Sequence, residues 1–334
     1  MKIGTVGTNF IVDTFIEAAK QTGKAGIGAV YSRNAETAAE FAKKHGVQKS
    51  YADRGAFLND GDLDFIYVAA PNSLHYQWTL DALNAGRNVI CEKPFVSNSA
   101  ELKKIVKTAE EKKLFLFEAL TVPHLPNFRL IREKLPFIGK IRLVQLNFSQ
   151  RSSRYDAFLA GKNPNLFNAG FSGGALMDLN YYNLCFVQRL FGEPGEIRYF
   201  ANKAENGIDT SGVLILKYED FIAEAAATKD SDSKNFVQIQ GEGGYIYSDS
   251  TASSLRTGFS VITKKTEEHF NLQETENVLY YELLDFIEAY TSGNPGVCFD
   301  AGLNTSLNDS LSCALLMDRA RKDSGVVFPA DRSL

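Results

Sequence analysis

Three side chains in this sequence suit proton transfer at a carbon–oxygen bond: those of Lys93, Asp178 and Tyr182. Lys93 follows a short apolar run and stands between Glu92 and Pro94, so it lies at the carboxyl end of an expected parallel strand, where open α/β sheets bind ligands. Asp178 and Tyr182 are four residues apart, which places both on one face of a helix expected over residues 175–190. An enzyme that interconverts a hydroxyl and a carbonyl group needs such side chains, because a proton must move to or from the substrate oxygen. We therefore predict one catalytic unit made of these three residues.

Each member of this unit also has a plain structural interpretation. As catalytic groups, Lys93 would polarise the substrate oxygen and Tyr182, or alternatively Lys93, would exchange the proton. A nearby cation can lower the pKa of a tyrosine from about 10. Alternatively, Asp178 is a helix-cap or salt-bridge carboxylate and Tyr182 is a half-buried packing aromatic. The preceding pair Gly173 and Gly174 would let the backbone approach closely at the start of the helix.

The first 120 residues alternate apolar runs with helical patterns. One helix is predicted between an Asn34 cap and Gly46, and another after a Ser99 cap. Strands that are apolar throughout, alternating with amphipathic helices, indicate a parallel sheet covered on both faces. The fold class is therefore α/β, with an N-terminal doubly wound Rossmann domain over residues 1–119. Its strands are expected at residues 2–6, 26–31, 63–70, 88–91 and 114–119.

The pattern changes after residue 120. Residues 141–148 alternate apolar and polar side chains, and two hairpins are expected around residues 218–220 and 241–244. Such alternation favours an antiparallel sheet with one packed face and one available face. Two late helices carry apolar positions near residues 279–290 and 307–315. We predict a C-terminal α+β domain over residues 120–334 with a large, mostly antiparallel sheet.

A dinucleotide-binding turn is expected directly after the first strand. The fingerprint GxGxxG falls on residues 7–12, of which only the first glycine is kept. Asparagine can replace the second glycine, because it accepts left-handed backbone angles better than most residues. The alternative is an ordinary strand–turn–helix corner. As a cofactor site, the helix N-terminus would receive the pyrophosphate, and its residues are Gly7, Thr8, Asn9, Phe10 and Ile11.

The end of the second strand bears on the choice between NADP and NAD. NAD-binding domains usually place an acid there, to bind the ribose hydroxyls. This chain has Ser32 and Arg33 instead, which would accept a 2′-phosphate through charge-assisted hydrogen bonds. The alternative is a solvated arginine on a loop. The absence of an acid favours NADP, with NAD as a second possibility.

Three segments of the chain together resemble one protein family. They are the N-terminal strand with its Gly7 turn, the Glu92-Lys93-Pro94 triplet, and Gly173-Gly174 followed by Asp178 and Tyr182. This combination resembles the Gfo/Idh/MocA family of nicotinamide-dependent oxidoreductases, and in particular its tyrosine branch, which is similar to dimeric dihydrodiol dehydrogenase. The resemblance implies hydride transfer between NAD(P) and a secondary alcohol or carbonyl of a sugar, cyclic polyol or diol. The alternative is a regulator of the same fold that binds the dinucleotide without turnover.

The resemblance also implies roles for single residues. Ala70, Asn72 and His75 would border the ribose and nicotinamide; for His75 the alternative is a structural histidine. Glu92 would contact the ribose, Lys93 would also bind the cofactor, and the bond before Pro94 is commonly cis in the family. The domain after residue 120 would bind substrate and mediate dimerisation. The resemblance implies that the substrate is bound by Lys93, His124, Asp178 and Tyr182. For His124 the alternative is an ordinary loop histidine. Asn180 and Cys185 replace residues common in the family, so substrate recognition can differ from that of other members.

Composition excludes several other classes of protein. The formal net charge is −4 and basic residues do not cluster, which argues against nucleic acid and membrane partners. Four scattered cysteines, four histidines and no apolar run of eighteen residues predict a cytoplasmic protein without a metal or a membrane span. We expect a small-molecule substrate and at least a homodimer.

Overall fold

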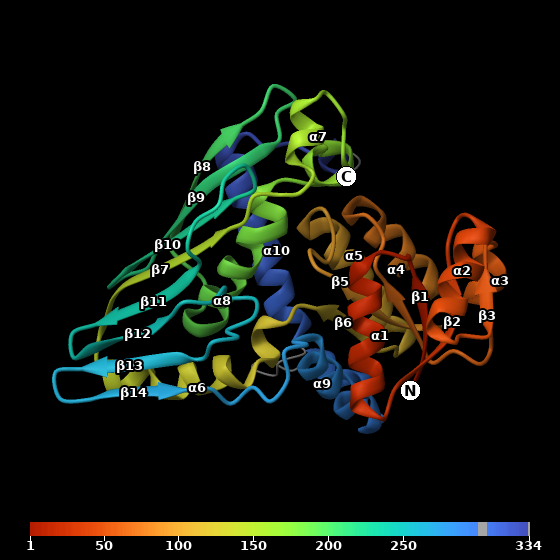
Figure 1. The fold of residues 1–334 in the computed structure, drawn as a ribbon, viewed down its shortest axis with the longest axis horizontal. Helices are drawn as coiled ribbons and strands as arrows, with labels where there is room; N and C mark the ends of the chain where they lie inside the picture. The colour runs from red at the N-terminus through yellow and green to blue at the C-terminus, as the bar shows by residue number, and fades with distance from the viewer. Residues whose placement is uncertain (300–305, 333–334) are drawn as a thin grey trace. The chain divides into compact units, whose positions relative to one another are not determined.

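The structure is a computed structural model and describes residues 1–299 and 306–332. The chain forms two compact units (Figure 1). The first contains Met1–Ala119 and Asn277–Leu311; the second contains Leu120–Glu276 and Ser312–Leu334. In the described part of the chain, no helix combines the length and apolar character that crossing a membrane requires.

Six strands form the sheet of the first unit, in the order β3-β2-β1-β4-β5-β6. All neighbouring strands run parallel. This is the strand order of dinucleotide-binding domains, in which ligands bind where the order reverses, here between β1 and β4. The predicted doubly wound parallel sheet is confirmed. Its strands are β1 (Lys2–Val6), β2 (Gly26–Tyr31), β3 (Lys49–Tyr51), β4 (Phe65–Val68), β5 (Asn88–Glu92) and β6 (Leu116–Ala119), and its helices are α1 (Phe10–Thr22), α2 (Ala35–His45), α3 (Arg54–Leu58), α4 (His75–Asn84), α5 (Ser99–Lys112) and α9 (Leu279–Thr291).

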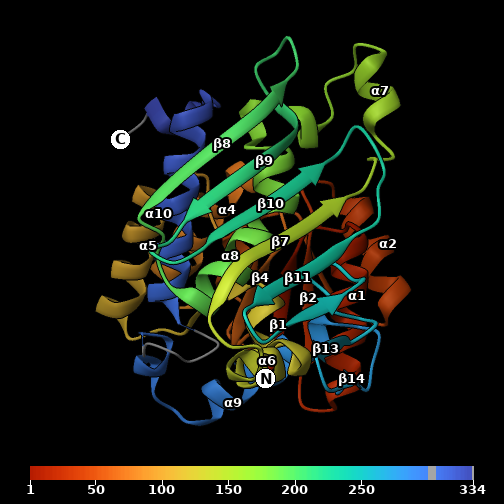
Figure 2. The same cartoon turned by 90° about the vertical axis from the view of Figure 1, so that its left-hand side faces the viewer.

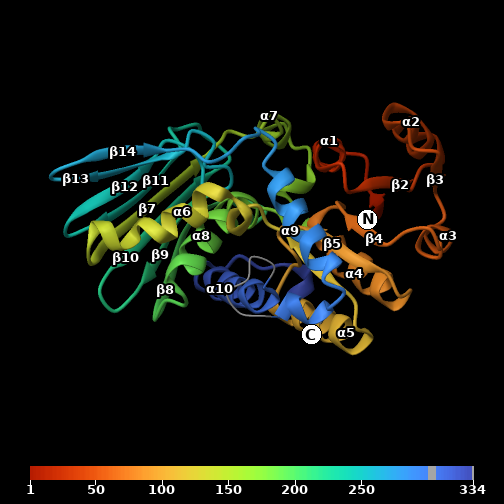
Figure 3. The same ribbon diagram turned by 90° about the horizontal axis from the view of Figure 1, so that it is seen from below.

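Helices cover both faces of this sheet, as its apolar strands require. Phe15 of α1 stacks on Tyr67 of β4 with ring centroids 3.7 Å apart, and Phe286 of α9 stacks on Phe117 of β6 at 4.6 Å. Because Tyr67 and Phe117 point to the same face, α1 and α9 lie together there (Figure 3). Trp78 of α4 contacts β2 from the opposite face.

The helix ends test the predicted caps. The side chain of Asn34 accepts a hydrogen bond from the first turn of α2, and Gly46 ends that helix with φ of 72°, so both predictions are confirmed. The predicted Ser99 cap is wrong by one residue. Asn98 is the N-cap, because its Oδ1 accepts the Glu101 N–H at 3.0 Å, and Ser99 is the first residue of α5.

Eight strands form the sheet of the second unit, in the order β14-β13-β12-β11-β7-β10-β9-β8 (Figure 2). Only the β7–β10 pair is parallel, so the prediction of a mostly antiparallel sheet is confirmed. The strands are β7 (Ile141–Ser149), β8 (Glu196–Lys203), β9 (Asp209–Lys217), β10 (Ile222–Thr228), β11 (Phe236–Gly241), β12 (Gly244–Ser248), β13 (Phe259–Thr263) and β14 (Glu267–Phe270). The helices α6 (Pro126–Lys134), α7 (Tyr155–Leu159) and α8 (Tyr181–Phe191) also belong to this unit, and α10 (Leu307–Ser324) is divided between the two units.

The two faces of this second sheet differ in burial. Alternate residues such as Val144 and Leu146 of β7 are buried against the helices of the unit. The other face keeps large apolar side chains accessible: Phe200 is 67% exposed, Ile222 43% and Tyr245 40%. The predicted combination of one packed face and one available face is present.

Candidate cofactor and catalytic site

Gly7 makes the turn between β1 and α1. Its φ is 109°, and a Cβ atom at this position would lie 2.7 Å from the carbonyl oxygen of Ala69. Side chains other than hydrogen are therefore excluded by both backbone conformation and space. The turn provides the close backbone approach that a dinucleotide pyrophosphate needs at a helix N-terminus.

Asn9 is the N-cap of α1. Its backbone is extended (φ −90°, ψ 174°), so the left-handed conformation given as the reason for an asparagine here is wrong. The side chain explains the residue instead: Oδ1 accepts the N–H groups of Ile11 and Val12, and Nδ2 donates to the Ala69 oxygen at 3.0 Å. Asn9 thus fixes the helix N-terminus to the end of β4, while Phe10 is 77% exposed.

Ser32 and Arg33 follow β2 at the same edge of the sheet. The Ser32 N–H donates to the Tyr51 oxygen at 3.1 Å, and its Oγ accepts the Asn34 N–H at 3.4 Å. Arg33 is exposed. The backbone of Ser32 is therefore held while the guanidinium faces solvent, which is compatible with phosphate binding.

His75 bridges two backbone segments at the carboxyl ends of β4 and β5. The ring is 1% exposed; Nδ1 lies 2.9 Å from the Pro94 oxygen and Nε2 lies 2.8 Å from the Ala70 oxygen. Burial lowers the pKa of His75, and a neutral ring donates to one of these carbonyls at a time. His75 has a structural role here, and its contact with a cofactor remains a prediction. Asn72 lies one turn earlier, in the segment Asn72–Leu74.

The Glu92-Lys93-Pro94 segment ends β5, and the Lys93–Pro94 bond is cis, as the resemblance implied. Glu92 is 7% exposed and accepts a hydrogen bond from the Tyr67 hydroxyl at 2.5 Å. Burial raises the pKa of Glu92 to about 7, against the opposing effects of the Tyr67 hydrogen bond and the Lys93 charge. Lys93 itself is half-buried.

A second buried acid, Glu282 of α9, lies on the same side of the sheet. It is fully buried, and neither of its carboxyl oxygens has a hydrogen-bond partner among the described residues. Burial, together with the charge of Glu92, raises the pKa of Glu282 well above its usual value. Sequence reasoning missed both Tyr67 and Glu282, because neither belongs to a local motif.

Replacing Glu92 with Gln should alter how stability depends on pH. The folded pKa of Glu92 is about 7 and its usual value is 4.5. Protonation of Glu92 therefore stabilises the folded chain. This stabilisation is fully present below the usual pKa of a glutamate and is lost as pH rises through the pKa of Glu92 in the folded chain. Between about pH 5 and pH 8, the unfolding free energy of the wild type should fall by on the order of 3 kcal/mol more than that of Glu92→Gln.

Urea unfolding at the two pH values measures this difference. Glu111→Gln is the control, because Glu111 lies on α5 with a 64% exposed side chain. Equal pH dependence in wild type and Glu92→Gln would contradict a raised pKa at Glu92.

Asp178 and Tyr182 lie in the second unit, on adjoining segments. The predicted α-helix over residues 175–190 is wrong in its first turn, because Leu176–Asn180 is a π-helical turn and α8 begins at Tyr181. Such turns occur frequently at functional sites. Asn180 is buried and donates from Nδ2 to the Ala225 oxygen at 2.9 Å, which ties this turn to β10. Tyr182 is half-buried, and its ring lies 6.1 Å from that of Phe148.

The carboxylate of Asp178 forms an ion pair with Lys229, which the sequence analysis did not identify. The salt-bridge interpretation of Asp178 is thus present in the structure, and a substrate-binding role is compatible with it because the side chain of Asp178 is 23% exposed. The side chain of Lys229 is only 5% exposed. No motif links the two residues, which are far apart in sequence and meet because the π-helical turn that carries Asp178 packs against β10.

The remaining predicted residue, His124, is 1% exposed and belongs to the 3₁₀ turn Val122–His124. The predicted cofactor residues thus gather at the carboxyl ends of β1, β2, β4 and β5, and Asp178 and Tyr182 lie together in the other unit. The meeting of Lys93 with Asp178 and Tyr182 remains a prediction. Among the described residues, no group of three His, Cys, Asp or Glu side chains could hold a metal ion.

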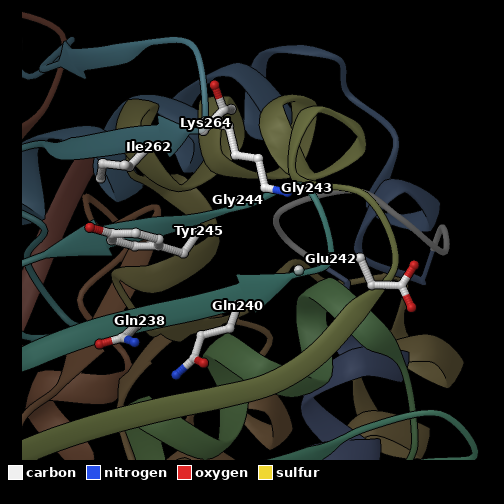
Figure 4. Close-up of a pocket in the computed structure, with 10 residues that line it drawn as sticks. Gln238, Gln240, Glu242, Gly243, Gly244, Tyr245, Ile262 and Lys264 are labelled. Atoms are coloured by element: carbon white, nitrogen blue, oxygen red, sulfur yellow. The ribbon is translucent and has the colours of Figure 1, made fainter.

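A cavity of about 510 Å³ lies at the β11–β12 hairpin, lined by Gln238, Gln240 and Tyr245 among others (Figure 4). Its side chains come from the exposed face of the second sheet. None of the predicted cofactor, catalytic or substrate residues lines it.

Comparison with known proteins decides the family. Residues 1–120 match the model described as "Oxidoreductase family, NAD-binding Rossmann fold", and residues 130–247 match the "GFO/IDH/MocA C-terminal domain". The uncharacterized oxidoreductase YgjR of Escherichia coli (strain K12) is 36% identical over 333 residues, 99% of this chain and 98% of that protein. The chain belongs to the Gfo/Idh/MocA family. The family resemblance drawn from the motifs is confirmed, and the chain is an NAD(P)-dependent oxidoreductase.

Two further proteins similar to this Gfo/Idh/MocA oxidoreductase are described with NADP. The scyllo-inositol 2-dehydrogenase (NADP(+)) IolU of Bacillus subtilis (strain 168) is 33% identical over 333 residues, covering 100% of both chains. A 3-ketoreductase from Actinomadura kijaniata, solved with NADP and TDP-benzene, has a TM-score of 0.84 at 22% identity and covers 97% of each chain. The second likeness shows the shared fold.

Proposed function

We propose that this chain is an NADP-dependent dehydrogenase that oxidises a secondary hydroxyl of a cyclic polyol or reduces the corresponding carbonyl. The observation that carries the proposal is the full-length likeness to an NADP-dependent scyllo-inositol dehydrogenase in a chain that has Lys93, Asp178 and Tyr182. Diols are related substrates, since trans-1,2-dihydrobenzene-1,2-diol dehydrogenase of Xenopus tropicalis is 29% identical over 90% of both chains.

The first unit fits the cofactor. The Gly7 turn offers a backbone surface that a Cβ atom would fill, and Ser32 with Arg33 would hold a 2′-phosphate. Bound NADP would accept or supply the hydride. Lys93 would orient the substrate oxygen, Tyr182 would take up or release its proton, and Asp178 would accept a hydrogen bond from a substrate hydroxyl.

An activity panel tests the proposal. The chain is mixed with NADP⁺ or NAD⁺ and with cyclic polyols, sugars and diols, and formation of reduced nicotinamide is followed by absorbance. We expect turnover with at least one cyclic polyol and a higher kcat/KM with NADP⁺. Binding of NADP⁺ without turnover on any substrate would instead identify a dinucleotide-binding regulator.

Arg33→Ala should weaken NADP binding by about 1.5–3 kcal/mol, because it removes a charge-assisted hydrogen bond to the 2′-phosphate. NAD has no such phosphate, so its Kd should be nearly unchanged. Calorimetric titration of both cofactors measures the difference. Lys43→Ala, which removes an exposed cation from the last turn of α2, is the control and should alter neither Kd. An equal loss for both cofactors would contradict a phosphate contact at Arg33.

The exposed face of the second sheet supports the proposal of a homodimer, because Phe200, Ile222 and Tyr245 keep large apolar surfaces accessible there. Phe200→Asp should shift the chain from dimer to monomer in light scattering at micromolar concentration. The control is Phe137→Asp, since Phe137 is 65% exposed in the turn Leu135–Ile138, outside this sheet. A monomeric wild type would refute the dimer.

The cytoplasm remains the proposed location. The four cysteines are buried and form no disulfide with one another, which suits a reducing compartment.

A further inference from the structure

Lys229 is held in place by its own backbone. It directly follows β10, its N–H donates to the Thr210 oxygen at 2.8 Å, and its carbonyl accepts the Ser152 N–H at 2.9 Å. Strand β9 on one side and the segment after β7 on the other thus fix the Cα position. The side chain is only 5% exposed. A lysine this deeply buried needs a compensating charge, because an unpaired buried cation costs several kcal/mol.

Asp178 supplies that charge on the side toward solvent. Its side chain is 23% exposed, so the lysine lies behind a carboxylate that still has accessible surface. A cation in contact favours the ionised form of a carboxylate. A carboxylate in this position can accept a hydrogen bond from an incoming hydroxyl.

A second acid connects Lys229 to the same π-helical turn. Asp209 of β9 is fully buried; its Oδ2 accepts the Leu176 N–H at 2.6 Å and the Tyr199 hydroxyl at 2.8 Å. Burial raises the pKa of Asp209, and the hydrogen bonds and the charge of Lys229 act against that rise. Lys229 thus acts electrostatically on Asp209, which anchors the start of the turn, and on Asp178, which lies in the turn.

We propose that Lys229 is a positioning residue for the reaction: it keeps Asp178 ionised and aimed as an acceptor for a substrate hydroxyl, and leaves the proton exchange to Tyr182. Titratable neighbours of the pair are Asp209, which interacts with the charge of Lys229, its hydrogen-bond partner Tyr199, and Tyr182, four residues after Asp178. This role rests on the proposed dehydrogenase function.

Steady-state kinetics against pH test the role in Lys229→Met, Lys229→Arg and a control, Lys140→Met. Lys140 forms an ion pair with Asp220 in the same unit, but the two side chains are 47% and 53% exposed. We expect Lys229→Met to lower kcat/KM for the polyol by about 10- to 100-fold, the worth of a charge-assisted hydrogen bond. The acid limb of its kcat/KM profile should move to higher pH, because the carboxylate has lost its neighbouring cation. Lys229→Arg should restore most of the loss, and Lys140→Met should match the wild type.

The double variant Asp178→Asn/Lys229→Met keeps the test decisive if Lys229→Met does not fold, since it removes both charges together. If Lys229 acts through Asp178, the double variant loses no more activity than Asp178→Asn alone. A pH profile of unchanged shape in Lys229→Met, or multiplicative losses in the double variant, would overturn the positioning role while leaving the dehydrogenase function intact. A wild type that turns over no substrate in the panel would overturn the function and this role together.

Discussion

Lys93→Ala and Tyr182→Phe should each lower kcat by about 10²–10⁴-fold, the usual contribution of a positioned acid or base. Lys93 directly follows β5 in the first unit, and Tyr182 lies in the first turn of α8 in the second. NADP affinity should be largely kept, because the phosphate-binding turn at Gly7 and the residues after β2 are unchanged. Stopped-flow and steady-state rates on the best substrate of the panel give the two losses.

The double variant decides whether the two residues share one proton. If Lys93 and Tyr182 act on the same substrate oxygen, the double variant should lose far less than the product of the single losses. Tyr218→Phe is the control, since it removes a tyrosine hydroxyl that donates to the Gly192 oxygen, away from Asp178 and Tyr182. Multiplicative losses, or a normal kcat in Tyr182→Phe, would show that the tyrosine only packs.

Gly174→Ala should destabilise the second unit by roughly 2–6 kcal/mol. Its φ is 106°, and a Cβ atom would lie 2.0 Å from Asp209 Oδ1. The backbone strain costs about 1–3 kcal/mol. Displacing the buried carboxylate from the Leu176 N–H adds a similar amount, because a buried polar group loses its partner. Urea unfolding measures the sum, and turnover should fall as well, since the turn that carries Asp178 shifts.

Gly207→Ala separates the two contributions. Gly207 has φ of 81° in the connection between β8 and β9, and nothing lies within 4 Å of its added Cβ atom. This variant should show the backbone cost alone, about 1–2 kcal/mol. Equal losses in Gly174→Ala and Gly207→Ala would mean that Asp209 moves aside without penalty.

Local signals in the sequence were sufficient for much of the fold. The apolar strands and the Asn34 and Gly46 caps of α2 depend on neighbouring residues, and the structure confirms them. Where two polar residues compete for one cap, the local signal is ambiguous, so Asn98 was missed in favour of Ser99. Asn9 was identified as a departure from the glycine fingerprint, but its physical reason is a hydrogen bond to Ala69, sixty residues away in sequence.

The site could be predicted only where it lies in motifs. Lys93, Asp178 and Tyr182 stand in recognisable segments. Lys229 meets Asp178 through tertiary packing, and Glu282 comes to the sheet on a helix from the far end of the chain. No local spacing encodes such pairs. The π-helical turn could not be predicted from the sequence either. It differs from an α-helix by one residue in its backbone hydrogen bonds, and this does not require different residue types.

Transfer of deuterium from carbon-deuterated scyllo-inositol to NADP⁺ tests the proposed hydride step most directly. The wild type is incubated with both, and the reduced nicotinamide is analysed by mass spectrometry. We expect a single deuterium in the NADPH, formed much more slowly by Tyr182→Phe, and little product with NAD⁺. If calorimetry shows bound NADP⁺ but no deuterium reaches it from this or any other deuterated polyol, sugar or diol of the panel, the chain is not the dehydrogenase proposed.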